Sequence, residues 1–189
     1  MTDKNDFLPE NYTVPSSSDG YMKLTQGENR FRVLSSAIMG SETWIEEGNS
    51  RKPKRWPFGV SVPVEEIGDD GVKHFWAFVV WNYNAKKVQI LEITQKGIMR
   101  SIRAMTKDED WGDPKKYDIV INREGEGKAT EYTVSPKPHK ELDGAIKRHY
   151  EELTINLEAL YEGLDPFAEA SKKVEDDIPA DFDKDIPFN

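Results

Sequence analysis

The segment between residues 73 and 93 constrains the fold more than any other part of the chain. Its two extended runs, His74–Trp81 and Lys87–Ile93, are rich in aromatic and β-branched residues, a composition typical of β-strands. The polar residues Asn82–Ala85 lie between the runs, and asparagine tolerates the unusual backbone angles of a tight turn. The segment therefore predicts a β-hairpin.

Pairing Trp81 with Val88 across that turn would give the hairpin two chemically different faces. One face carries small or branched aliphatic residues suited to a packed interior: Ala77, Val79, Val88 and Ile90. The other carries aromatic and polar residues: Trp76, Phe78, Asn82, Lys87 and Gln89. We expect the second face to bind a ligand. The alternative is that Trp76 and Phe78 are core, and a slip of one residue would exchange the faces.

Further strands are expected on both sides of this hairpin. Before it, Asn29–Met39 alternates apolar with basic residues, and Glu42–Glu47 reads as a short strand. After it, apolar residues at helical spacing follow Thr94, which we expect to be the N-cap, and a second hairpin spans Tyr117–Arg123 and Thr130–Ser135. The expected fold class is mainly β: a five-stranded OB-fold barrel with a helix between strands three and four.

The ends of the chain differ from this middle. Residues 1–20 contain prolines and a serine cluster and predict a flexible N-terminal arm, and residues 21–140 form the expected OB-fold domain. Residues 141–164 carry one apolar stripe, which predicts a C-terminal helix that packs on the barrel or on a partner subunit. Residues 165–189 hold too little apolar content for a core and predict a disordered acidic tail.

Composition excludes several classes of protein. The chain has no cysteine, which excludes disulfides, zinc ribbons and cysteine nucleophiles. The longest apolar run, Phe75–Trp81, is far shorter than the roughly 20 residues of a membrane helix. With no hydrophobic signal core either, we expect a soluble, cytoplasmic protein. The three histidines are scattered and no catalytic or P-loop motif occurs, so we expect no enzymatic activity, no cofactor and no metal site.

The net charge of −9 is distributed unevenly. Residues 28–140 hold 19 Lys or Arg against 17 Asp or Glu, whereas residues 165–189 hold 3 Lys against 8 Asp or Glu. A faintly basic middle followed by an acidic end suits a protein that binds a polyanion through its middle. A tail that only adds solubility would give the same pattern.

Binding of a single strand needs aromatic rings that stack on bases and cations that contact phosphates. The stacking candidates are Trp44, Trp56, Trp76 and Phe78. The phosphate candidates are Arg30, Arg32, Lys52, Lys54, Arg55, Lys73 and Lys87. Several of them fall in residues 51–58, RKPKRWPF, which we expect to form a flexible loop that closes over a polyanion. A solvated loop and a solvated strand face are the alternatives.

The segments Tyr21–Leu24, Asn29–Leu34, His74–Phe78 and Asp110–Pro114 give the chain a family resemblance. Together they resemble the single-stranded DNA-binding proteins of tailed bacteriophages, over residues 21–140. The resemblance implies an OB-fold that coats single-stranded DNA with little sequence preference. It also implies a role in phage DNA replication, recombination or repair, in the cytoplasm of a host bacterium.

The last residues of the chain carry a second resemblance. Asp185, Ile186, Pro187 and Phe188 follow an acidic run and are similar to the acidic tip of bacterial single-stranded DNA-binding proteins. That tip docks its phenylalanine and terminal carboxylate on repair and replication enzymes, so the expected partners are phage or host replication and recombination proteins. Asn189 departs from the pattern because it displaces the terminal carboxylate by one residue.

These observations predict a single-stranded DNA-binding protein whose affinity falls steeply with salt. The acidic tail is expected to compete with DNA for the basic residues, so truncation at about Leu164 should tighten DNA binding. The alternatives are a protein-interaction module and an RNA-binding OB-fold protein without a DNA-coating role. Formation of a homo-oligomer is left open.

Overall fold

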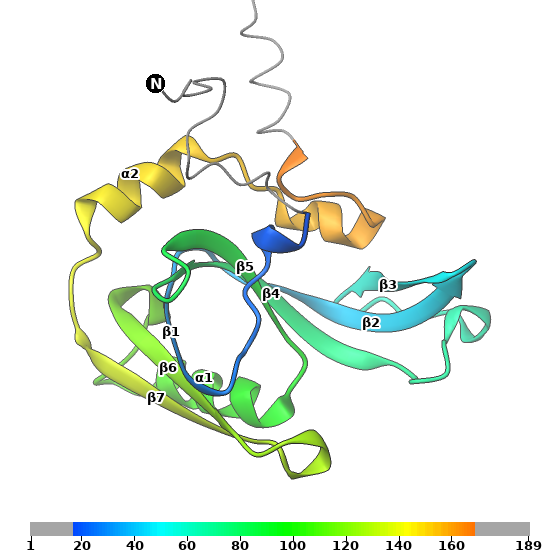
Figure 1. Cartoon of the computed structure of the whole chain (residues 1–189), viewed down its shortest axis with the longest axis horizontal. Coiled ribbons are helices and arrows are strands. Elements are labelled where there is room, and N and C mark those ends of the chain that lie inside the picture. Colours follow the sequence, from blue (N-terminus) through cyan, green and yellow to red (C-terminus); the bar gives the residue numbers. More distant parts are fainter. Residues whose placement is uncertain (1–16, 169–189) are drawn as a thin grey trace, which may run out of the picture.

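The computed structural model describes residues 17–168 and is mainly β, with its strands in one antiparallel sheet (Figure 1). The strands are β1 (Gly27–Val33), β2 (Ile38–Glu47), β3 (Ser50–Pro57), β4 (Lys73–Asn82), β5 (Lys87–Ile93), β6 (Tyr117–Glu124) and β7 (Glu131–His139). The α-helices are α1 (Lys96–Lys107) and α2 (Gly144–Glu152), and a 3-10 segment, η5 (Leu157–Glu162), follows α2. In this described range no helix has the length and apolar character to cross a membrane.

Strand β4 is the centre of the sheet. One of its edges pairs first with β2 and then with β1, and its other edge pairs with β5. The sheet continues from β1 to β6 and β7, and from β2 to β3. Among the described residues β5 and β7 do not pair with each other, so the ladders leave the sheet open. The mainly β class is confirmed, whereas the five-strand count and the closed barrel are not.

The central hairpin forms in the predicted register. Trp81 lies opposite Val88, and the remaining pairs of β4 and β5 follow from it. In the turn, the side-chain oxygen of Asn82 accepts a hydrogen bond of 3.0 Å from the backbone amide of Asn84. An asparagine that bonds its own backbone two residues on is a recurrent way to close such a turn.

Both faces of this hairpin are largely buried, which corrects the expected ligand-binding face everywhere except at its ends, where Trp76 is half-buried and Lys87 is exposed. The predicted aliphatic face does lie in apolar surroundings, beneath the segment that contains α2 and η5. The face predicted to bind a ligand lines the main core instead, and its residues Phe78, Val80, Leu91 and Ile93 pack against α1 and β6. Gln89 and Asn82 on that face are also buried and hydrogen-bond each other at 2.8 Å. Sequence alternation alone could not show that each face has a cover.

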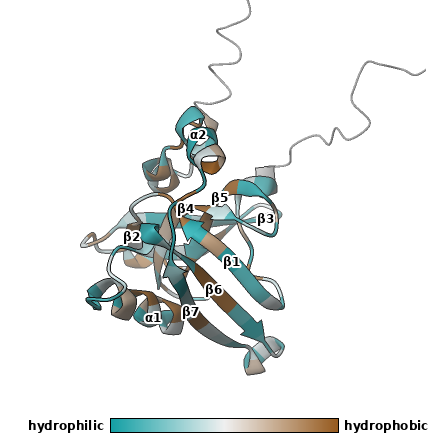
Figure 2. Cartoon of the chain, turned by 90° about the vertical axis from the view of Figure 1, so that its left-hand side faces the viewer, coloured by the Kyte–Doolittle hydropathy of each residue, from teal (hydrophilic) through white to brown (hydrophobic). Residues whose placement is uncertain are grey.

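Helix α1 lies at the opposite end of the molecule from α2, with hydrophobic residues of the sheet between the two helices (Figure 2). Its predicted apolar stripe is confirmed, because Ile98, Ile102 and Met105 are buried in the main core. The N-cap position is held by Gln95, one residue after the expected Thr94, and the Gln95 side chain makes no capping bond. The helix thus depends on burial of one face more than on its cap.

The hairpin of β2 and β3 projects from the body of the sheet (Figure 1). Residues 51–58 were expected to form a loop, but β3 pairs with β2 along its whole length. Prolines are tolerated there because β3 is an edge strand. Strand β2 runs straight through Gly40, whereas the strand expected over Asn29–Met39 breaks between Val33 and Ile38. Gly40 is required because a Cβ at this position would lie 1.9 Å from the carbonyl oxygen of Trp56.

The C-terminal segment is broken where one long helix was expected. Helix α2 ends at Glu152, and η5 begins after Asn156, whose side chain accepts a hydrogen bond from the amide of Glu158. The predicted apolar stripe still packs on the outer face of β4 and β5, with Ile146 near Val79 in one cluster and Leu160 in another. β-Branched residues and the capping Asn156 lie at the break, and both disfavour a continuous helix.

The N-terminal end of the described chain borders β5. Residues 17–20 form a short 3-10 turn, and the amide of Met22 donates a hydrogen bond of 2.9 Å to the carbonyl of Ile90. The rest of the expected arm, residues 1–16, lies outside the described residues. The same holds for most of the expected acidic tail, residues 169–189, including the motif Asp185–Phe188.

Candidate nucleic-acid interface

Most of the cations expected to contact phosphates are paired with carboxylates. The ion pairs are Arg30 and Arg32 with Asp118, Lys52 with Glu47, Lys54 with Glu66, Arg55 with Glu42 and Glu92, and Lys87 with Asp19. Lys73 has no ion pair within residues 17–168, but it pairs with Glu42 in the ladder between β4 and β2. A cation that already faces a carboxylate has less charge to offer to a phosphate.

Arg32 is a scaffold residue and not a phosphate ligand. Its side chain is 1% exposed, and its Nε donates to Asp118 at 2.6 Å. Arg30 donates to the other carboxylate oxygen of Asp118 at 2.6 Å. The hydroxyl of Tyr83 donates at 3.0 Å to the same oxygen as Arg32. Burial works to raise the pKa of Asp118, but the hydrogen bonds from Arg30 and Arg32 outweigh it and leave that pKa lowered.

Arg55 is likewise buried, between two carboxylates on the outer face of the sheet. Its Nη2 donates to Glu92 at 2.6 Å, and its Nε lies 3.4 Å from Glu42. Burial raises the pKa of Glu92 to about 7; the charge of Arg55 opposes the rise, and the neighbouring Glu42 adds to it. The expected roles of Arg32 and Arg55 in phosphate binding are therefore corrected to structural ones.

The four expected stacking residues separate into three environments. Phe78 is 4% exposed and belongs to the core, so it is removed from the candidates. Trp56 and Trp44 lie on opposite faces of the β2–β3 hairpin, because Trp56 pairs with Ser41 and Trp44 with Pro53. Each ring has a cation over it: Lys54 stands 5.8 Å from the centre of Trp56, and Arg51 stands 5.5 Å from the centre of Trp44.

Trp76 is half-buried at the point where β4 leaves the main core. The register brings other rings onto its face of the sheet, since Ser41 of β2 pairs with both Trp56 and His74, and Met39 pairs with Trp76. Phe58, which is 71% exposed, stands 5.9 Å from the ring of His74. We call this set of five side chains the Trp76 surface: Met39, Trp56, Phe58, His74 and Trp76.

Cations of α1 border the Trp76 surface. A hollow of about 250 Å³ is lined by His74, Trp76 and Met99, together with Lys96, Arg100 and Arg103. These three cations are exposed and have no ion pair within residues 17–168. They follow at i, i+4 and i+7 along the helix, so a basic stripe beside the apolar stripe was visible in the sequence.

Trp76 also lines a second hollow on its other side. This hollow, of about 380 Å³, is mostly apolar and opens between the β1–β2 connection, α1 and the turn at Pro114. Its residue Lys115 is shared with a third and larger hollow, of about 570 Å³. The three hollows thus lie in a row: Trp76 lines the first and second, and Lys115 lines the second and third. Such a series suits an extended ligand with alternating flat and charged groups.

The described residues offer no obvious metal centre. No three His, Asp or Glu side chains within residues 17–168 come together in a metal-binding arrangement. Comparisons with protein-family models, with curated proteins and with solved structures find no match to the chain.

Proposed function

We propose that this protein binds single-stranded DNA with little sequence preference, through the Trp76 surface and the cations of α1. The observation that carries the proposal is Trp76, a half-exposed ring between two hollows, with Arg100 and Arg103 beside it. Rings stack on any base, and cations contact the phosphates between bases. Both parts occur on one side of the sheet, and neither depends on the identity of a base.

We also propose that the sheet is an elaborated OB-fold. Strand β1 pairs with both β4 and β6, the hairpin β4–β5 precedes α1, and the hairpin β6–β7 follows it. This order supports a five-stranded Greek-key arrangement with its helix between strands three and four. The hairpin β2–β3 is then an insertion between strands one and two, where OB-folds commonly carry a ligand-binding loop.

The proposed DNA site is not on the outer face of β4 and β5. That face is covered by the C-terminal segment, with Leu160 and Ile146 among the packing residues. The Trp76 surface lies on the opposite face of the same strands, where β4 leaves the core. Phe58 and Met39 are large apolar residues exposed on this surface, and exposed apolar residues that gather together commonly mark a binding site.

The biological role that we propose is coating of DNA during phage replication, recombination or repair, in the cytoplasm of a host bacterium. In this proposal the protein is not an enzyme. The acidic segment that ends in Asp185–Phe188 would recruit replication or recombination proteins of the phage or the host. This role rests on the family resemblance and on the charge of the tail.

Trp56 and Trp44 give a matched test of the proposal, because they lie on opposite faces of one hairpin, each beneath a cation. We expect Trp56→Ala to weaken binding of a fluorescein-labelled dT20 by about tenfold or more, since a stacked base contributes roughly 1–3 kcal/mol. Trp44→Ala should leave the affinity unchanged. Fluorescence anisotropy measures both, and thermal unfolding checks that both variants fold.

The wild-type protein should also bind single-stranded DNA, duplex DNA and RNA of equal length with different affinities. We expect single-stranded DNA to bind more tightly than duplex DNA, whose bases are already stacked on each other. Tighter binding of RNA than of DNA would favour the RNA-binding alternative. Absence of binding to all three, or equal losses in Trp56→Ala and Trp44→Ala, would contradict the proposal.

A further inference from the structure

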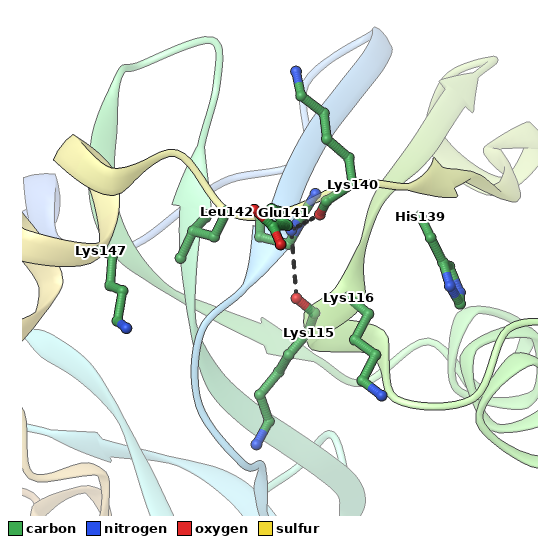
Figure 3. Close-up of a pocket in the computed structure, with 8 residues that line it drawn as sticks. Lys115, Lys116, His139, Lys140, Glu141, Leu142 and Lys147 are labelled. Carbon is green, nitrogen blue, oxygen red and sulfur yellow. Dashed lines mark hydrogen bonds between the residues drawn. The ribbon is translucent and has the colours of Figure 1, made fainter.

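A hollow of about 570 Å³ is lined by lysines that the proposed Trp76 site does not use. Lys115 and Lys116 come from the turn before β6, Lys140 follows β7, and Lys147 belongs to α2. All four are exposed, and Glu141 is the one carboxylate in the lining. We call this hollow the lysine groove. Figure 3 shows its lysines spread around the opening instead of converging on one point.

The buried Arg32 holds the two walls of the lysine groove in place. Its Nη1 donates to the carbonyl of Lys140 at 2.9 Å and to the carbonyl of Lys115 at 3.4 Å. The amide of Lys140 donates to the carbonyl of Lys116 at 3.1 Å. These bonds use backbone atoms, so the ammonium groups of the three lysines remain available to a ligand.

The lysines of the groove differ electrostatically from the cations singled out in the sequence. Within residues 17–168, Lys115, Lys116 and Lys140 have no ion pair, and Lys147 has only a long contact of 3.9 Å with Glu151. Four ammonium groups of like charge around one hollow repel each other, and a polyanion relieves that repulsion. Because they are spread apart, they suit several successive phosphates better than one small anion.

The lysine groove borders the apolar hollow beside Trp76. Lys115 lines both, so the two sites are neighbours that meet at this exposed side chain. A strand whose bases stack at Trp76 can therefore continue with its phosphates over Lys115 toward Lys140 and Lys147.

We propose that the lysine groove is a second, purely electrostatic subsite that binds the phosphates of single-stranded DNA leaving the Trp76 surface. The inference rests on the proposed function and extends it, because it gives the direction in which the strand continues. It predicts that long oligonucleotides use both subsites, whereas short ones fill only the stacking site.

The test compares two triple variants that remove the same charge. One is Lys115→Gln, Lys116→Gln and Lys140→Gln, and the control is Lys23→Gln, Lys86→Gln and Lys128→Gln, all at exposed positions. Binding of labelled dT8 and dT20 is followed by anisotropy between 20 and 300 mM NaCl. Each phosphate contact on single-stranded DNA adds about 0.7 to the slope of log affinity against log salt.

We expect the groove variant to bind dT20 at least tenfold more weakly at low salt and to lose about 2 from the salt slope. Its affinity for dT8 should stay near that of the wild type, and the control should match the wild type with both oligonucleotides. A second measurement is independent of any variant: dT20 should protect Lys115, Lys116 and Lys140 from acetylation, and leave Lys23 and Lys128 reactive.

The outcomes distinguish a failure of the lysine groove from a failure of the proposed DNA binding. If the wild type binds dT20 and Trp56→Ala weakens it, but the groove variant keeps its slope and its lysines stay reactive, the lysine groove is overturned and the proposed function stands. If the wild type binds neither oligonucleotide, both fail. Equal losses of affinity for dT20 in the groove variant and in the control would show a general effect of charge, and would overturn the lysine groove as a subsite.

Discussion

Asp118 is the residue on which the walls of the lysine groove depend, because it compensates the buried charge of Arg32. Asp118→Ala should destabilise the fold by about 3–5 kcal/mol, the range found when one partner of a buried ion pair is removed. Urea unfolding at pH 7 measures this change. Asp69→Ala, at an exposed position, serves as the control and should change stability by less than about 0.5 kcal/mol. A loss of similar size in both variants would mean that Arg32 is stabilised in some other way.

Glu92 gives the fold a pH dependence near neutrality. Its pKa of about 7 in the folded state lies above the ordinary value of 4.5, so the folded protein holds a proton that the unfolded chain has released. As far as this group is concerned, stability is therefore highest below about pH 4.5 and falls as the pH rises through 7, by about 3 kcal/mol in all. Asp118 acts in the opposite sense, but its lowered pKa confines that effect to more acidic solutions.

We predict that Glu92→Gln removes this pH dependence of stability. Because Gln keeps the shape and stays neutral, the variant should be more stable than the wild type at pH 8 and similar to it at pH 5. Unfolding free energies at intervals of one pH unit between 5 and 8 provide the measurement. Parallel curves for the two proteins would show that Glu92 is charged in the folded state.

Among the elements, β2 and β3 approach each other closely at Gly40, and a substitution there tests whether this approach is needed. Gly40→Ala puts a Cβ within 1.9 Å of the carbonyl oxygen of Trp56, so the strands must separate. We expect a loss of about 1–3 kcal/mol, typical of overpacking. Gly97→Ala in α1 meets nothing within 4 Å and should stabilise by about 0.5–1 kcal/mol. Urea unfolding of both variants checks the contrast, and a stable Gly40→Ala variant would show that the hairpin can shift without cost.

These elements also show what the sequence can and cannot predict. The β4–β5 register and α1 were predicted because each depends on local pattern, an asparagine turn in one case and a helical spacing in the other. Strand β3 was missed because its prolines and cations hide any alternation, and its extended form is imposed by pairing with β2. Trp76 and Phe78 are two residues apart on one face, yet only tertiary packing decides which of them is core.

The candidate site was harder to predict for the same reason. The sequence does not show which basic residues are already paired with a carboxylate and which are free to bind a phosphate. Asp118, the partner of Arg32, lies 86 residues after it. Lys116 and Lys140, by contrast, are brought together by a backbone hydrogen bond that no local pattern encodes. Only the stripe Lys96, Arg100 and Arg103 could have been recognised from spacing alone.

At the scale of the whole molecule, charge is divided between the described part and the C-terminal end. Residues 17–168 hold 22 Lys or Arg against 25 Asp or Glu, nearly balanced for their length, and residues 169–189 hold 3 Lys against 7 Asp or Glu. In the function that we propose, the exposed cations of α1 and of the lysine groove attract both DNA and this acidic segment. The two ligands should compete wherever salt leaves their charges unscreened.

Removal of residues 169–189 should accordingly tighten binding of dT20, most clearly at 20 mM NaCl, with the difference fading by about 300 mM as the screening length shortens. The cut falls after Ala168 because Phe167 packs with Leu160 on the sheet and should be kept. A full-length variant with the seven tail carboxylates changed to amides is the control for chain length, and it should match the truncated protein. Equal or weaker binding by the truncated protein at low salt would rule out competition and leave the tail a role in solubility or in binding partners.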